Sequence, residues 1–370
     1  MAAIRQFPAD ISRAAQFSVL GTTKGPFGEE VRDLAGVVAS RLLSRWNGTV
    51  DKNPPNLDLV RDFDEECTRA GLAQLFSEAS DGGEGSESLA ASAIRGFAEA
   101  DGGIAAIFLA RLAAVLPWVQ GSVEVPVVDG WSTAWSGGSR PDVVWAWGWR
   151  DGLPITVCVP GEGSAWRLQL LPAQHLGSVE VHQRMGLRAC PSAWVRVHLG
   201  EPMASIEVGR ETIARWRSLV AGWWAVIALA RGRAALSEAV RYASVRYQGG
   251  ALLIEHPLVQ EMLGRAFEAV VAAEALLTRG FSGDASSLAA GTSLATQASE
   301  RAAHTAQQVF GGYGYMRDYP VERCLRDVKM AAVAAGGSAR LRVATAHAVC
   351  AAEGVHLPDK GEGVSLGSAG

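Results

Sequence analysis

The sequence has little charge and no block of a single sign. Charged residues make up 19% of the 370 residues, and 34 Lys and Arg are balanced by 38 Asp and Glu. A nucleic-acid-binding protein needs a clustered basic surface, and this sequence contains neither a basic block nor an acidic tail. Nucleic acid is therefore not expected as a partner.

Cysteine is also scarce. The five cysteines are scattered without a Cys-x-x-Cys pair or a histidine at zinc-like spacing, so we expect free thiols, no metal site and a cytoplasmic location. The first ten residues lack the apolar run of a signal peptide. The most apolar segment, residues 219–230, is too short to span a bilayer, which predicts a buried helix and no membrane association.

Hydrophobic spacing divides the chain into three parts and a tail. Three- and four-residue steps predict an N-terminal α-helical domain over residues 1–120 and a C-terminal helical bundle over residues 207–352. Between them, residues 121–206 contain short runs rich in β-branched and aromatic residues, which predict a small antiparallel β domain. Its many tryptophans are interpreted as packing residues rather than ligand-stacking ones. Residues 353–370, rich in Gly, Ser and charge, predict a flexible tail.

A glycine-rich turn in the C-terminal part carries the most specific pattern. Gln308 and the pair Gly311-Gly312 end one predicted helix, and Pro320 begins the next at a position where proline is tolerated. Backbone amides at such a turn suit a phosphate or diphosphate. On spacing alone, a helix-loop-helix corner that binds nothing is the favoured interpretation.

The residues of this turn closely resemble the acyl-CoA dehydrogenase family. The pattern Gln308-x-x-Gly311-Gly312-x-Gly314-Tyr315 is followed by Pro320-Val321-Glu322-Arg323 and then by Arg326-Asp327-x-Lys329. The resemblance implies an α+β fold made of an N-terminal helical domain, a small antiparallel β domain and a C-terminal four-helix bundle. It also implies that Gln308, Gly311 and Gly312 contact an FAD shared across a subunit interface. A second segment, Tyr242-Ala243-x-x-Arg246, resembles the family segment whose arginine faces the FAD phosphates.

The sequence departs from the family where the chemistry is expected. The family removes a Cα proton with a glutamate, and its usual position corresponds to Ala335. In a minority of members the glutamate lies on an earlier helix beside an arginine, which aligns with Trp216 and the substrate-binding candidate Arg217. Glu211, and less directly Glu207, lie upstream as weaker candidates for a relocated base, and Glu211 also suits a helix N-terminus. The family's flavin-ring loop, Thr-Glu-Pro-x-Ala-Gly-Ser, is not found.

Three functions follow from this combination. In the first, the chain is a subunit of a heteromeric FAD-dependent acyl-CoA dehydrogenase that supplies interface FAD contacts but no catalytic base. In the second, it is a self-sufficient, homo-oligomeric acyl-CoA dehydrogenase with a relocated base. In the third, the fold serves a non-redox role as a binding protein or lyase, because fold does not fix chemistry. The first two predict an acyl-CoA or acyl-thioester substrate, whose chain length the sequence does not specify.

Overall fold

Four helices lie in the described residues of the N-terminal part of the computed structural model. They are α1 (Pro26–Arg45), α2 (Leu57–Arg69), α4 (Ser86–Ala100) and α5 (Gly102–Gln120). The structure describes residues 26–46, 50–51, 57–72, 86–120, 132–135, 143–149, 152–160, 166–180, 184–198 and 200–355. The predicted C-terminal tail and the segment 121–131, where the flavin-ring loop was sought, lie largely or wholly outside these residues.

A mixed sheet follows the N-terminal helices. Its strands are β1 (Ser132–Trp135), β2 (Val143–Trp147), β3 (Ile155–Pro160), β4 (Trp166–Leu171), β5 (Leu176–Glu180), β6 (Ser192–Val197) and β7 (Ala204–Val208), with a short η3 (Ala173–His175) before β5. They are arranged in the order β5-β6-β2-β1-β3-β4-β7. The expectation of a purely antiparallel sheet was wrong in one pair, because β1 and β3 run parallel. The predicted boundary at residue 206 falls inside β7, two residues before that strand ends.

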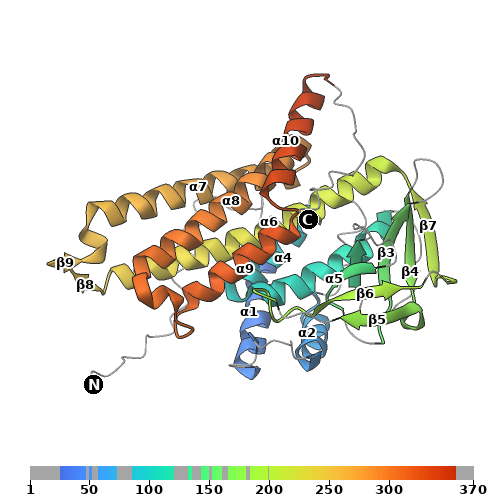
Figure 1. Ribbon diagram of the computed structural model, residues 1–370, viewed down its shortest axis with the longest axis horizontal. Helices are drawn as coiled ribbons and strands as arrows, with labels where there is room; N and C mark the ends of the chain where they lie inside the picture. The colour runs from blue at the N-terminus through green and yellow to red at the C-terminus, as the bar shows by residue number, and fades with distance from the viewer. Residues whose placement is uncertain are drawn as a thin grey trace, which may run out of the picture.

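The C-terminal part is a helical bundle. It consists of α6 (Arg210–Ala243), α7 (Pro257–Phe281), α8 (Ala285–Phe310), α9 (Pro320–Ala334) and α10 (Ser338–Ala352). The connections contain a two-stranded ribbon of β8 (Tyr247–Gln248) and β9 (Ala251–Leu252), followed by η4 (Leu253–Glu255), and, between α8 and α9, η5 (Gly311–Tyr315). In α10, Leu341 is the buried residue, and this helix stands away from the bundle in Figure 1.

The longest helix, α6, runs through the middle of the molecule. The helix continues past Arg231 for about three more turns. Arg231 is itself buried and donates to the carbonyl oxygens of Ala98 and Ala100 at the end of α4. By length and composition α6 is long enough to cross a membrane, but 83% of its apolar window is buried inside the protein. It therefore has the character of a core helix.

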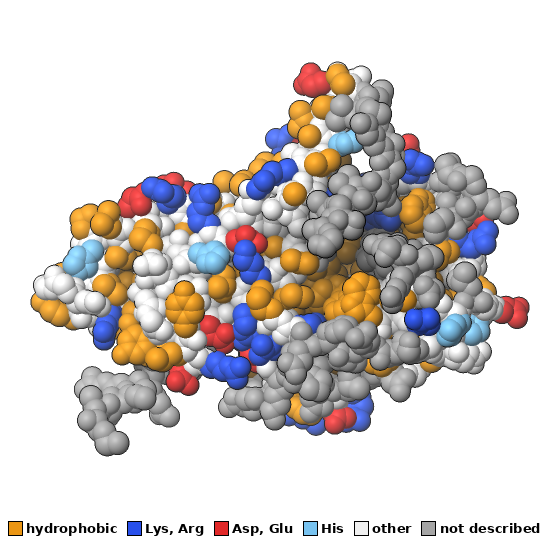
Figure 2. Space-filling view, viewed as in Figure 1, with side chains coloured by type: hydrophobic (Ala, Val, Ile, Leu, Met, Phe, Trp, Pro, Cys, Tyr) orange, Lys and Arg blue, Asp and Glu red, His pale blue; other side chains and the backbone are white. Residues whose placement is uncertain are grey.

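The sheet packs one face against the helices. Thr156 on β3 accepts a hydrogen bond from the indole of Trp118 and donates to the Ala114 carbonyl oxygen, both on α5, at 3.1 and 3.2 Å. Leu168 and Leu170 of β4 join the same core as α5 and α6. Figure 2 shows hydrophobic side chains in the hollow between the helices and the sheet, with charged side chains around it.

Candidate functional site

A cleft of about 520 Å³ lies where α6 ends, α7 begins and α8 turns into α9. It contains all four residues that the sequence assigned to cofactor binding. Its lining comprises Tyr242, Arg246, Gln248, Gly249, Leu253, His256, Gln308, Val309, Phe310, Gly311, Gly312 and Tyr313. The structure thus brings together Arg246 and the Gln308–Gly312 turn, which are more than sixty residues apart in the chain.

The turn has the backbone geometry that its glycines predicted. Phe310 ends α8, and Gly311 adopts a φ of +58°, a left-handed conformation that side-chain-bearing residues rarely adopt. A Cβ at Gly311 or at Gly312 would meet no atom within 4 Å, so the backbone there is open to a ligand. Gly314 instead packs against Gln307, whose amide nitrogen donates to the Gly314 carbonyl oxygen at 3.3 Å. Pro320 then occupies the first turn of α9, as predicted.

Aromatic side chains of the cleft lining pack against one another and against Tyr319. Tyr242 of α6 stacks on Phe310 of α8 with ring centroids 4.2 Å apart, and Tyr319 meets both rings edge-on or nearly so. The guanidinium of Arg246 lies 5.7 Å from the centre of the Tyr313 ring, which holds its charge over the cleft. His256 is the N-cap of α7, and its ring nitrogen Nε2 is 2.9 Å from the Gln248 carbonyl oxygen.

These residues fit the diphosphate part of a dinucleotide. An arginine supplies fixed positive charge and several N–H donors, and two glycines allow close approach of the backbone. The exposed side-chain amide of Gln308 offers both a donor and an acceptor. The cleft can therefore bind an anionic, hydrogen-bonding group.

The positions assigned to a catalytic base hold no carboxylate. Ala335 follows the last turn of α9 and is 5% exposed, while Trp216 is 1% exposed in the core. Neither side chain can accept a proton from a substrate. Glu211, the relocated-base candidate, is exposed in the first turn of α6, and Glu207 on β7 pairs with Arg167 at 3.0 Å.

The substrate-binding candidate Arg217 lies beside the sheet. Its guanidinium stacks over the Trp166 ring at 4.8 Å, and burial lowers its pKa. Burial also raises the pKa of the nearby Cys158 thiol to about 11, although Arg217 opposes the shift. This thiol therefore stays protonated at neutral pH and is not a nucleophile.

The cleft and the base position at Trp216 lie at opposite ends of α6. Trp216 is in the second turn of this helix and Arg246 follows its last residue, so 27 residues of helix, about 40 Å, lie between Trp216 and Ala243. Figure 1 shows the β8–β9 ribbon at one end of the molecule and the seven-stranded sheet at the other. The cleft and this chain's own sheet therefore lie far apart.

Tryptophans dominate the sheet end. Trp194, 42% exposed, contacts Trp145 with ring centroids 5.0 Å apart, and Trp145 contacts Trp147 at 5.9 Å. Trp147 packs in turn on Trp224 of α6 at 4.8 Å. Three of these four rings pack into or against the core, in agreement with the interpretation that the tryptophans serve packing.

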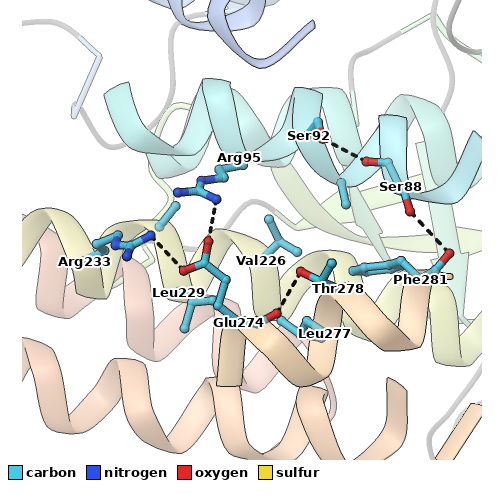
Figure 3. A pocket seen from close by; sticks show the side chains of 12 residues that line it. Ser88, Ser92, Arg95, Val226, Leu229, Arg233, Glu274, Leu277, Thr278 and Phe281 are labelled. Carbon is cyan, nitrogen blue, oxygen red and sulfur yellow. Dashed lines mark hydrogen bonds and ion pairs between the residues drawn. The ribbon is translucent and has the colours of Figure 1, made fainter. Parts of the chain in front are cut away.

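A second, smaller cavity of about 40 Å³ lies between α4, α6 and α7 (Figure 3). At its inner end Glu274, 6% exposed, accepts hydrogen bonds from Arg95 at 2.6 Å and from Arg233 at 2.8 Å. Arg95 also donates to Glu99 at 2.8 Å. The charges balance, and the cavity is large enough for a few water molecules.

Sequence reasoning missed the buried ion pairs. Glu274 lies in a helical stripe that was identified only by its apolar residues, and its partners Arg95 and Arg233 come from two other helices. Asp101 and Asp327 are fully buried as well, although both belong to segments that the family pattern singled out. That pattern was the available signal for Asp327, but its partners could not be assigned without the fold.

Comparison with known proteins identifies the C-terminal part. Residues 221–349 match the family model described as acyl-CoA dehydrogenase, C-terminal domain. An acyl-CoA dehydrogenase of Bacillus subtilis is 38% identical over 142 residues, which cover 36% of this chain and 34% of that protein. A cyclohexane-1-carbonyl-CoA dehydrogenase of Geobacter metallireducens is 31% identical over 128 residues, covering 33% of this chain and 34% of that protein. The matched segments thus span about a third of the length of these relatives.

The fold comparison covers most of the chain. Butyryl-CoA dehydrogenase of Megasphaera elsdenii superimposes with a TM-score of 0.67 at 17% identity, over 89% of this chain and 100% of that one. Similarity at this identity shows the fold, which covers the N-terminal helices and the sheet as well as the C-terminal bundle. Residues 221–349 therefore match the acyl-CoA dehydrogenase C-terminal domain, and the chain has the fold of the butyryl-CoA dehydrogenase structure.

Proposed function

We propose that this chain is a component of an FAD-dependent acyl-CoA α,β-dehydrogenase that binds FAD at an interface with a homologous catalytic subunit. Arg246, Gln308, Gly311 and Gly312 contact the diphosphate half of the cofactor. The partner subunit supplies the flavin-ring site and the catalytic base. When bound, FAD accepts the hydride that leaves Cβ of an acyl thioester.

The observation that supports this proposal is the separation of the two ends of α6. The cleft has an arginine and an open glycine turn, whereas Trp216 and Ala335 occupy both positions where the family places its base. A chain that retains the residues of the cleft and lacks a carboxylate at the base positions is suited to contribute to a partner's site. Exposed apolar side chains surround the cleft, among them Tyr247 at 66%, Leu258 at 78% and Tyr315 at 77%, and a partner surface would cover them.

In this arrangement the residues of this chain hold the cofactor and exclude water. Arg246 neutralises phosphate charge, and the glycine turn lets the backbone approach the phosphate oxygens. The Cα proton of the substrate is removed by a carboxylate of the partner. The substrate is an acyl-CoA or another acyl thioester.

Purification of the chain alone and with its partner tests the proposal. After desalting, we expect the isolated chain to be colourless, with no flavin absorbance in the visible region. The tagged chain recovered from its native host is expected to carry a homologous subunit and FAD. A yellow, catalytically active homo-oligomer of the chain alone would instead identify a self-sufficient dehydrogenase, in which case Glu211→Gln should abolish activity.

A further inference from the structure

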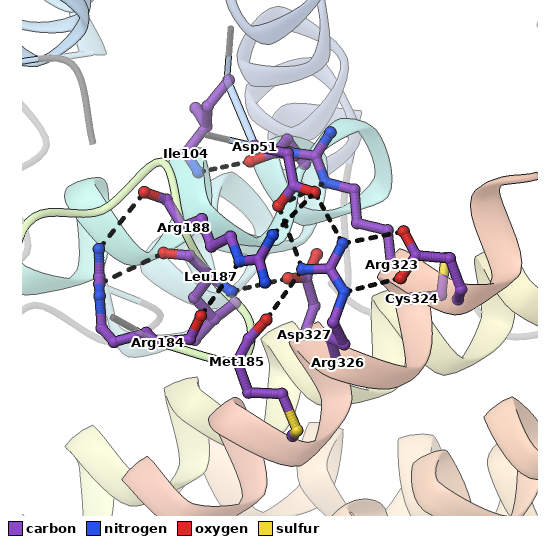
Figure 4. A network of polar contacts seen from close by, with 12 residues as sticks. Asp51, Ile104, Arg184, Met185, Leu187, Arg188, Arg323, Cys324, Arg326 and Asp327 are labelled. Carbon is purple, nitrogen blue, oxygen red and sulfur yellow. Dashed lines mark hydrogen bonds and ion pairs between the residues drawn. The ribbon is translucent and has the colours of Figure 1, made fainter. Parts of the chain in front are cut away.

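A buried carboxylate on α9 joins three parts of the molecule. Oδ1 of Asp327, which is 1% exposed, accepts the backbone N–H of Leu187 at 2.7 Å. Oδ2 of the same side chain is 3.4 Å from Nε of Arg231 in α6. Leu187 belongs to the loop of residues 184–190 that leads into β6, so this single side chain connects the sheet to the bundle (Figure 4).

A second carboxylate ties α9 to the N-terminal helices. Asp101, fully buried between α4 and α5, accepts the N–H of Ile104 at 3.0 Å and pairs with Arg323 of α9. We call the set Asp101, Leu187, Arg231, Arg323 and Asp327 the interdomain clasp. It holds α9 against the sheet loop, the N-terminal helices and α6.

Leu187 is held in an unfavourable conformation. Its φ is +53°, the one positive value among the non-glycine residues that the structure describes, and its side chain is fully buried. A left-handed conformation is sterically unfavourable for such a residue and persists only where surrounding contacts impose it. The backbone N–H of Leu187 donates to Asp327, and its carbonyl oxygen accepts the backbone N–H of Cys190 at 3.1 Å within the same loop.

The loop of residues 184–190 is closely packed on either side of Leu187. A Cβ at Gly186 would lie 2.2 Å from the Arg326 carbonyl oxygen of α9, and one at Gly103 would lie 2.7 Å from Ala189. Arg326 donates to the Met185 carbonyl oxygen at 2.9 Å. The loop is therefore pressed against the backbones of α9 and α5, and a small displacement would break several contacts at once.

We propose that Asp327 is a positioning residue, whose carboxylate holds Leu187 in its left-handed conformation and thereby locks the loop of residues 184–190 onto α9. When this contact is lost, Leu187 relaxes to a negative φ and the loop leaves α9. The contact between Asp327 and Leu187 involves none of the residues that line the cleft. Asp327 lies on α9, which begins five residues after the η5 turn beside the cleft and so connects the cleft to the sheet loop.

Hydrogen exchange and limited trypsin digestion of the full-length chain test the clasp. Arg184 is 5% exposed, and the side chain of Arg188 is 18% exposed, so both trypsin sites are protected while the loop is closed. In Asp327→Ala we expect cleavage after these two residues to accelerate at least tenfold and exchange of the Leu187 amide to become fast. In Asp327→Asn, whose side-chain oxygen still accepts the N–H, the Leu187 amide should stay within about twofold of the parent.

Two further variants separate positioning from general loss of stability. Glu274→Gln removes another buried, arginine-paired carboxylate far from the loop, and it should raise cleavage at all sites together without selecting Arg184 and Arg188. Gly186→Ala displaces the loop without altering a charge, and it should expose the same two sites even if Asp327→Ala does not fold. The proposal is wrong if Asp327→Ala or Gly186→Ala leaves the Leu187 amide protected. It is also wrong if Asp327→Asn loses that protection as fully as the alanine variant.

Discussion

At the scale of single residues, buried charged side chains are the feature that the sequence did not predict. Glu274, Asp101 and Asp327 are all less than 10% exposed, and each is matched by arginines from elements distant in the chain. The sequence shows such residues only as polar interruptions of an apolar stripe. Their partners depend on how helices cross, which no local pattern encodes.

The Glu274 cluster gives a prediction about stability. Glu274→Ala leaves Arg95 and Arg233 without their shared partner, and loss of one member of a buried ion pair costs about 3–5 kcal/mol. Urea unfolding followed by tryptophan fluorescence should show this loss. Glu261→Ala, which breaks an exposed pair with Arg265 on the same helix, is the matched control and should cost less than about 1 kcal/mol. Equal losses in the two variants would contradict the assignment of Glu274 to the core.

At the scale of elements, local signals predicted the glycine turn and the start of α9. Pro320 begins α9, and Gly311 follows the last residue of α8. Each of these residues constrains the backbone by itself, which is why sequence alone sufficed. The parallel pairing of β1 with β3 and the continuation of α6 beyond Arg231 were not predicted, because both depend on tertiary partners.

The glycine turn gives a prediction with an internal control. Gly311 has a φ of +58°, so Gly311→Ala should lower the free energy of unfolding by about 1–2 kcal/mol through backbone strain alone. Gly312 has neither a positive φ nor a close neighbour, so Gly312→Ala should change stability by less than about 0.5 kcal/mol. Thermal unfolding of the two variants measures the difference. An equal effect at both positions would mean that the turn differs from the one described.

At the scale of the whole molecule, the family resemblance predicted the fold and the cluster of cleft residues, but not their place in the molecule. The sequence placed Arg246 and Gln308 in one functional set, and the structure brings them into one cleft. The distance along α6 between this cleft and Trp216 emerges only from the length of that helix. This separation, together with the matching residues, supports the proposal of a cofactor site shared between two subunits.

The central claim is that this chain binds the diphosphate of an FAD whose ring lies on a partner. The most direct test measures FAD retained per chain in the complex purified from the native host, for Arg246→Ala and for Arg265→Ala. Arg265 is an exposed arginine on α7 outside the cleft. Loss of a charge-assisted phosphate contact is worth about 1.5–3 kcal/mol, so Arg246→Ala should weaken FAD binding roughly 10- to 150-fold while Arg265→Ala binds as the parent does. Undiminished FAD in the Arg246→Ala complex would contradict the account.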